Sequence, residues 1–206
     1  MEEEFEDNTN EQIFELHEKQ LRFGKDLLNE YGAKITIESA IPFAEASINA
    51  DSSLLQEFVE EGHGVGTHCG NAEGETIEEL AESYLERKNL VDQLVGKENN
   101  RGCSGGFGTT DYVLAAEQAG LNYLDGVVYF AYLSIDQELR PDQVSDEDIL
   151  NKYYHYSVIP EFSDHIYPRF LENAEDFVED KNGEIVLLNG ELGGLSSLSE
   201  GRSTCG

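Results

Sequence analysis

The chain has 206 residues, of which 39 % are hydrophobic, and this is enough for a single domain (residues 1–206) with a packed core. Its 13 Lys and Arg against 43 Asp and Glu give a net charge of −30, which disfavours binding to nucleic acid or to an anionic membrane surface. No stretch approaches the roughly 18 consecutive apolar residues of a membrane helix, so we expect neither nucleic acid nor membrane as a partner.

The acidity has two interpretations. The apolar residues are plentiful and periodic, so the charge does not indicate disorder. We expect an acidic, strongly hydrated surface of the halophilic type, because high salt screens the mutual repulsion of so many carboxylates. An ordinary acidic mesophilic protein is the alternative.

The cysteines and the N-terminus indicate the compartment. The chain has an odd number of cysteines, Cys69, Cys103 and Cys205, and no two of them form a C-x-x-C pair. We therefore expect free buried thiols in a reducing compartment. The chain begins with Met followed by three Glu, the opposite of the basic start of a signal peptide. Both features predict a cytoplasmic protein, with a secreted form left open.

The predicted elements alternate between helices and strands. Apolar residues recur at helical spacing in five segments, and apolar runs between them predict strands. Three helix starts match a capping box, beginning at Thr9, Ser53 and Thr76. The predicted helices are 10–31, 54–61, 77–94, 110–118 and 170–178, and the predicted strands are 35–37, 64–67, 102–104, 124–135 and 184–188.

This alternation predicts a parallel sheet with helices outside it. About six strand–helix units in a chain of this length suit an irregular (β/α) barrel better than an open sheet. In either architecture the chemistry is expected on the loops that follow the strands.

Polar side chains stand at the ends of several predicted strands. Glu6 and Asp7 follow a strand tail at residues 4–5, His68 follows the strand at 64–67, and Asn189 follows the last strand. Carboxylates and an imidazole on one face suit a metal-assisted hydrolase. In a chain with 43 acidic residues, however, a carboxylate pair is usually a solvated surface.

Four segments resemble the motifs of the polysaccharide deacetylase family, the nodulation-type carbohydrate esterases. Residues 62–68, Gly-His-Gly-Val-Gly-Thr-His, resemble the second motif, which has a G-H-E-I-G-x-H core. Residues 5–8, Phe-Glu-Asp-Asn, are similar to the first motif, F-D-D-G. Residues 101–108 are similar to the third motif, and 184–189 are similar to the last, a strand that ends in L-x-H. Order and spacing agree from residue 5 to about residue 189.

The resemblance implies the irregular (β/α) barrel of that family and a metal-dependent reaction. Asp7 would be a metal ligand, Glu6 the catalytic base and His68 the first His ligand. The metal would be a divalent ion, zinc before others, unless the chain has lost it. The substrate would be an acetylated glycan or amino sugar.

The third and last motifs imply the rest of the site. Arg101 and Asn189 would take the catalytic positions of these motifs. Ser104, Gly105 and Gly106 would line the substrate groove, with a backbone N–H near Ser104 that stabilises the oxyanion.

The chain departs from the family pattern at two positions. Ala72 stands where the second His ligand belongs, and Asn189 replaces the His that acts as general acid. The chain also begins close to the first motif, so we expect a domain truncated at its N-terminus. Side chains that could complete the site are Glu73, His63, Cys69 and Glu191.

Three functions are therefore compatible with the sequence. The first is a metal-dependent hydrolase that removes acetyl groups from a glycan or amino sugar. The second is a degenerate relative that binds carbohydrate or a partner without turnover. The third is an amidohydrolase that acts on a small molecule. The oligomeric state cannot be read from the sequence.

Overall fold

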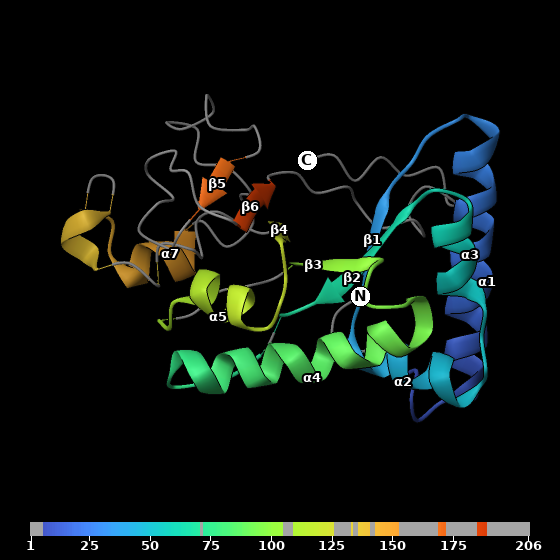
Figure 1. Cartoon of the computed structure of the whole chain (residues 1–206), viewed down its shortest axis with the longest axis horizontal. Coiled ribbons are helices and arrows are strands. Elements are labelled where there is room, and N and C mark those ends of the chain that lie inside the picture. Colours follow the sequence, from blue (N-terminus) through green and yellow to red (C-terminus); the bar gives the residue numbers. More distant parts are fainter. Residues whose placement is uncertain are drawn as a thin grey trace. The chain divides into compact units, whose positions relative to one another are not determined.

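The computed structural model describes residues 6–70, 72–104, 109–125, 133, 136–140, 143–152, 169–171 and 185–188 (Figure 1). These residues form two compact units. Unit 1 consists of 6–68 and 88–100, and unit 2 consists of the described residues within 69–87 and 101–191. Helix α4 and strand β3 contribute residues to both units. The structure has the predicted α/β class, with parallel strands and helices.

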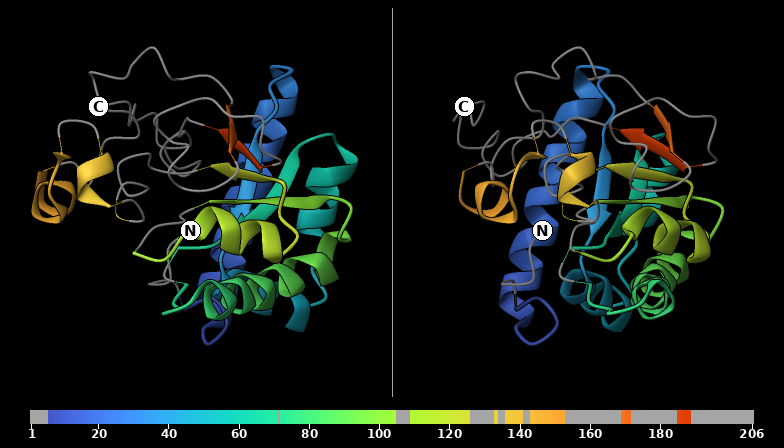
Figure 2. Two further views of the ribbon diagram at one scale, coloured as in Figure 1. Left: turned by 60° about the vertical axis from the view of Figure 1, so that its left-hand side comes forward. Right: turned by 90° about the vertical axis from the view of Figure 1, so that its left-hand side faces the viewer.

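Unit 1 combines two parallel strands with helices, and Figure 2 shows α1 alongside β1. Ile37 of β1 lies opposite Val65 of β2. Asn100, the first residue of β3, lies next to β2 and accepts a hydrogen bond from Thr67. The elements of unit 1 are α1 (Glu11–Glu30), β1 (Thr36–Ser39), α2 (Ile41–Asn49), α3 (Leu54–Glu60), β2 (Gly64–His68) and the C-terminal part of α4 (Ile77–Val95).

Of the three predicted capping boxes, only the one at Thr76 forms, and only in part, because the Glu79 carboxylate accepts the backbone N–H of Glu75 and not that of Thr76. The Thr76 hydroxyl accepts the backbone N–H of Glu79 at 3.2 Å, as predicted. The prediction for Thr9 is wrong, because Asn10 is the N-cap of α1 and its side chain accepts two backbone N–H groups of the first turn. Ser53 is the N-cap of α3 but makes no capping bond, since its hydroxyl donates to Glu57 instead.

The core of unit 1 comes from the apolar faces of its helices, together with Val65 of β2. The side chains from the helices recur at helical spacing, which places them on one side of each helix. The buried set is Phe14, Leu21, Phe43, Ala44, Ala46, Leu54, Leu55, Phe58, Val65, Val91 and Val95.

A buried polar network centres on Asn100, whose side chain is fully buried in unit 1. The Asn100 amide nitrogen donates to the carbonyl of Lys88 at 3.1 Å and to the carboxylate of Asp92 at 2.8 Å. Its amide oxygen accepts from the Thr67 hydroxyl at 3.0 Å. The Lys88 ammonium donates to the other carboxylate oxygen of Asp92 at 2.7 Å. Each polar atom of the Asn100 side chain therefore has a partner, which ties α4 to β2 and to the start of β3.

The strands of unit 2 are hydrogen-bonded in the order β3-β4-β6-β5. The first three strands are parallel, and β5 is antiparallel to β6. The elements of unit 2 are the first part of α4, most of β3 (Asn100–Ser104), α5 (Tyr112–Gln118), β4 (Tyr123–Asp125), the 3-10 helix η2 (Gln137–Leu139), α7 (Asp146–Lys152), β5 (Arg169–Leu171) and β6 (Ile185–Leu188).

The predicted helix at 170–178 is wrong at its start, because β5 covers Arg169–Leu171. Phe170 and Leu171 pair with Val186 and Ile185 of β6, and this sheet pairing overrides the helical spacing. Residues 172–178 lie outside the described part of the chain, as do residues 126–132, 134 and 135 of the predicted strand at 124–135.

The core of unit 2 contains a disulfide between Cys69 and Cys103, so the prediction of free thiols is wrong for these two residues. The Cα atoms are 5.8 Å apart, within the range that a disulfide needs. The backbone N–H of Cys69 also donates to the carbonyl of Ser104 at 2.7 Å. The core side chains are Cys69, Leu80, Ala81, Tyr84, Cys103, Tyr112, Val113, Ala115, Ala116, Ala119, Leu121, Leu124 and Ile149.

Gly102 and Tyr123 lie opposite each other on the neighbouring strands β3 and β4. The phenol ring of Tyr123 covers the Gly102 backbone, and a Cβ placed at Gly102 would lie 1.8 Å from the ring carbon Cζ. A side chain at position 102 therefore cannot coexist with this position of the ring.

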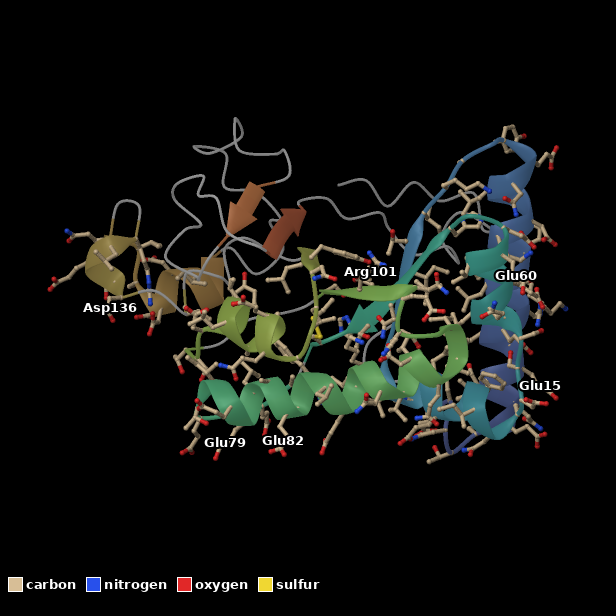
Figure 3. All side chains as sticks on the ribbon, viewed as in Figure 1. Glu15, Glu60, Glu79, Glu82, Arg101 and Asp136 are labelled. Carbon is tan, nitrogen blue, oxygen red and sulfur yellow. A yellow bond between two sulfur atoms is a disulfide. The ribbon has the colours of Figure 1, made fainter. Side chains whose placement is uncertain are left out.

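The exposed surface of both units is acidic. Figure 3 labels five exposed acidic side chains, Glu15, Glu60, Glu79, Glu82 and Asp136. Among the helices that the structure describes, none combines the length and the apolar character needed to cross a bilayer.

Candidate functional site

Asp7 is held in a tight turn that leads into α1. The carbonyl of Glu6 accepts the backbone N–H groups of Thr9 at 3.0 Å and Asn10 at 2.7 Å, which fixes the turn. The turn buries Asp7, whose residue exposure is 3 %, while Glu6 is exposed. The two acidic residues of the first motif therefore have opposite environments.

The two carboxylate oxygens of Asp7 also differ. Oδ1 lies 2.7 Å from Nδ1 of His17 on α1. Oδ2 is buried and has no hydrogen-bond partner among the described residues. An unpartnered buried carboxylate oxygen is costly unless a donor or a cation meets it. Because oxygen ligands suit divalent cations, the Asp7 side chain fits the ligand role predicted for it.

His68 is the last residue of β2 and is half-buried in unit 1. In the described part of the chain, no three side chains of His, Cys, Asp or Glu are grouped closely enough to hold a metal ion. Among the described residues, one oxygen of Asp7 is therefore available to a metal ion. The described residues do not form the set of three protein ligands that is typical of catalytic zinc. The ligand role of His68 stays a prediction.

The residues predicted from the third motif belong to unit 2. Arg101 is exposed on β3, where Figure 3 labels it, and Ser104 is half-buried at the end of the same strand. Gly105, Gly106 and Asn189 lie outside the described residues. The catalytic and substrate-binding roles of these residues stay predictions.

Two of the side chains that could have completed the metal site are engaged elsewhere. Cys69 is bonded to Cys103, so it supplies no thiolate ligand. His63 is buried, and both of its ring nitrogens lie within hydrogen-bond distance of other groups of unit 1. Glu73 is exposed in unit 2, and Glu191 lies outside the described residues.

Ala72 occupies the position where the family pattern has its second His ligand. It is partly buried, and its side chain packs against the hydrophobic core of unit 2. Its backbone N–H donates to the carbonyl of Cys69 at 3.2 Å. Position 72 therefore holds an apolar residue in apolar surroundings, where the family pattern has an imidazole ligand.

Sequence reasoning missed the role of His17. It lies within the predicted helix 10–31, between Phe14 and Leu21. The ten-residue separation of Asp7 and His17 matches no catalytic motif, so no sequence signal pairs them. Only the turn before α1 brings the carboxylate to the imidazole.

The surroundings of His63 lower the pKa of its imidazole. The largest cause is burial, which disfavours the charged imidazolium. The positive charges of Lys34 and Lys25 also lower the pKa, and the negative charge of Glu61 raises it. Nδ1 is 3.3 Å from the backbone N–H of Ile35, so it must act as an acceptor there. Protonated His63 would lose this hydrogen bond.

We therefore expect acid to weaken the folded state through His63. Since the folded pKa lies below the unfolded value of about 6.5, the stabilisation is present above that pH and is lost as the pH falls through the folded pKa. The free energy of unfolding in urea should drop by about 1 kcal/mol through this residue between pH 7.5 and 5. In His63→Asn this loss of stability between pH 7.5 and 5 should be absent. If the free energy of unfolding of that variant depends on pH as that of the unmodified chain does, His63 is not its cause.

A shallow groove of about 290 Å³ lies between α4 and α5 in unit 2. It is lined by Glu78, Ala81, Glu82, Leu85 and Gln118. None of the predicted site residues that the structure describes lines this groove.

The described geometry thus gives a buried, histidine-bound carboxylate in the segment that resembles the first motif, and a half-buried histidine at the end of the segment that resembles the second. Comparisons with protein-family models, with curated proteins and with solved structures give no match to this chain.

Proposed function

We propose that this chain is a metal-dependent hydrolase of the polysaccharide deacetylase type, which removes acetyl groups from an acetylated glycan or amino sugar. The fold proposed with it is the irregular (β/α) barrel of that family. The proposal is carried by one observation, the buried and unpartnered Oδ2 of Asp7 within the segment that resembles the family's first motif. A buried carboxylate oxygen that has no hydrogen-bond partner is suited to binding a cation.

The proposed roles follow from the environments of the residues in unit 1. Asp7 would hold a divalent cation through Oδ2, and His68 would contribute an imidazole ligand. When bound, such an ion activates water and polarises the acetyl carbonyl. Glu6 is exposed, so its carboxylate is accessible to accept a proton as the general base. Arg101, Ser104 and Asn189 keep the roles implied by the resemblance.

The test is the release of acetate from N-acetylated chito-oligosaccharides in the presence of Zn²⁺. We expect turnover by the unmodified chain and a fall of about 100-fold in Asp7→Asn, because the amide keeps the shape of the side chain and removes its charge. The matched control is Asp51→Asn, which neutralises an exposed carboxylate of unit 1 and should leave the rate unchanged. Equal rates in Asp7→Asn and the unmodified chain would contradict the proposal.

A specific observation favours a second candidate function, carbohydrate binding without turnover. The side chain at position 72 packs into an apolar core, where the family pattern has a metal ligand. A chain with this function would bind chito-oligosaccharides in calorimetry and release no acetate with any divalent ion. That pair of results would replace the first proposal with the second.

A further inference from the structure

His17 lies on the inward face of α1, three residues after the buried Phe14 and four residues before the buried Leu21. This spacing places the three side chains on one side of the helix. The His17 side chain is 15 % exposed, and the Asp7 side chain that it meets is fully buried. The pair therefore lies at the inner side of the helix and is largely protected from water.

The hydrogen bond between the two residues has one direction. A carboxylate only accepts, so Nδ1 of His17 donates to Oδ1 of Asp7 at 2.7 Å. This distance is typical of a charge-assisted hydrogen bond. It fixes the rotation of the carboxylate about its Cβ–Cγ bond, and with it the direction of the second oxygen.

The turn before α1 fixes the other end of the Asp7 side chain. The carbonyl of Glu6 accepts the N–H of Thr9, the N–H of Asn10 and also the Thr9 hydroxyl, the last at 3.2 Å. Backbone and side chain of Asp7 are thus both held, and the atom left without a partner among the described residues is Oδ2.

We propose that His17 is the positioning residue for Asp7, and that its Nδ1–H holds Oδ1 so that Oδ2 faces a divalent cation. The inference rests on the proposed function in that it takes Asp7 as a metal ligand, and it adds a residue that none of the family motifs contains. Ligating carboxylates and imidazoles are generally oriented by such outer hydrogen bonds, and loss of one typically weakens metal binding by about 10–100-fold.

The experiment measures the affinity of the full chain for Zn²⁺ alone by calorimetry, in two variants that differ at one group. His17→Leu removes the donor and keeps an apolar side chain of similar size. His17→Asn keeps an N–H donor at the place of Nδ1. We expect His17→Leu to weaken Zn²⁺ binding about 10–100-fold and His17→Asn to restore it to within about threefold of the unmodified chain.

Two further variants identify the site that is being measured. Asp7→Asn should remove the Zn²⁺ binding that depends on this carboxylate, which separates it from weak binding to the acidic surface. His63→Leu removes another buried imidazole of unit 1 and should leave the affinity unchanged, although it lowers stability. The rise in melting temperature on adding Zn²⁺ gives a second readout, since a merely structural His17 would alter the melting temperature and not its increase with metal.

Each outcome has a distinct meaning. Equal Zn²⁺ affinity in His17→Leu and the unmodified chain overturns the inference, as does an affinity in His17→Asn as low as in His17→Leu. Equal affinity in Asp7→Asn and the unmodified chain overturns both the inference and the metal role of Asp7. The expected affinities without acetate release would leave the positioning role of His17 in place and remove the deacetylase proposal.

Discussion

Asn100→Asp is expected to lower the free energy of unfolding by about 3 kcal/mol at pH 7, the equivalent of a rise of about two units in the pKa of the new carboxyl group. The substitution keeps the shape of the side chain. It replaces the amide nitrogen, which donates to Asp92 at 2.8 Å and to the Lys88 carbonyl at 3.1 Å, with an acceptor. Two carboxylates at this distance cannot both stay ionised, so the folded state must take up a proton.

The pH dependence distinguishes this effect from a loss of packing. The folded pKa of the new group is expected above its unfolded value, so the penalty relative to the unmodified chain should shrink as the pH falls through the folded pKa. Asn100→Leu also removes the hydrogen bonds but adds no charge, and its penalty should be the same at pH 7 and pH 5. Urea unfolding at both pH values measures the difference. A penalty in Asn100→Asp that does not change with pH would contradict the network.

Reduction of the disulfide between Cys69 and Cys103 is expected to lower the free energy of unfolding by about 3–4 kcal/mol. The two cysteines are 34 residues apart in sequence, so the bond closes a loop that restricts the unfolded chain much more than the folded one. Both residues are buried in the core of unit 2, at 1 % and 0 % exposure. Unfolding in urea with and without a phosphine reductant measures the effect.

Two variants test whether this pair is responsible. The double variant Cys69→Ala/Cys103→Ala should be as unstable as the reduced chain and should not respond to the reductant. Cys205→Ser keeps the pair and should respond as the unmodified chain does. If the reductant leaves the unfolding curve of the unmodified chain unchanged, the two sulfurs are not bonded in solution.

Much of the architecture could be predicted because its signals are local. The helical spacing of apolar residues identified α1, α3, α4 and α5, and short segments between the helices identified β1, β2, β3 and β6. Helix α2 was missed because its N-cap, Ala40, has no capping group, and because its side chains are apolar without a clear period. The short strand β5 was predicted as a helix because its strand character comes from pairing with β6, which lies far along the chain.

The candidate site could be predicted only where a residue's role follows from its own segment. Asp7 was singled out from its motif and is buried in the structure, while its ligand role stays a prediction. The partner on α1, His17, depends on the path of a turn, and the bond between Cys69 and Cys103 depends on strand neighbours 34 residues apart. Such contacts arise from tertiary structure and leave no spacing pattern. The salt dependence expected from the charge of −30 stays a prediction.

The contact between Gly102 and Tyr123 has a consequence for how this sequence can change through evolution. The ring of Tyr123 occupies the volume that any side chain at position 102 would need. A mutation at one position therefore restricts which residues are acceptable at the other, and a larger residue at 102 becomes tolerable only after the aromatic ring at 123 has been lost or turned away. In an alignment of descendants of this chain, the two positions should change together, and glycine should persist wherever the aromatic residue does.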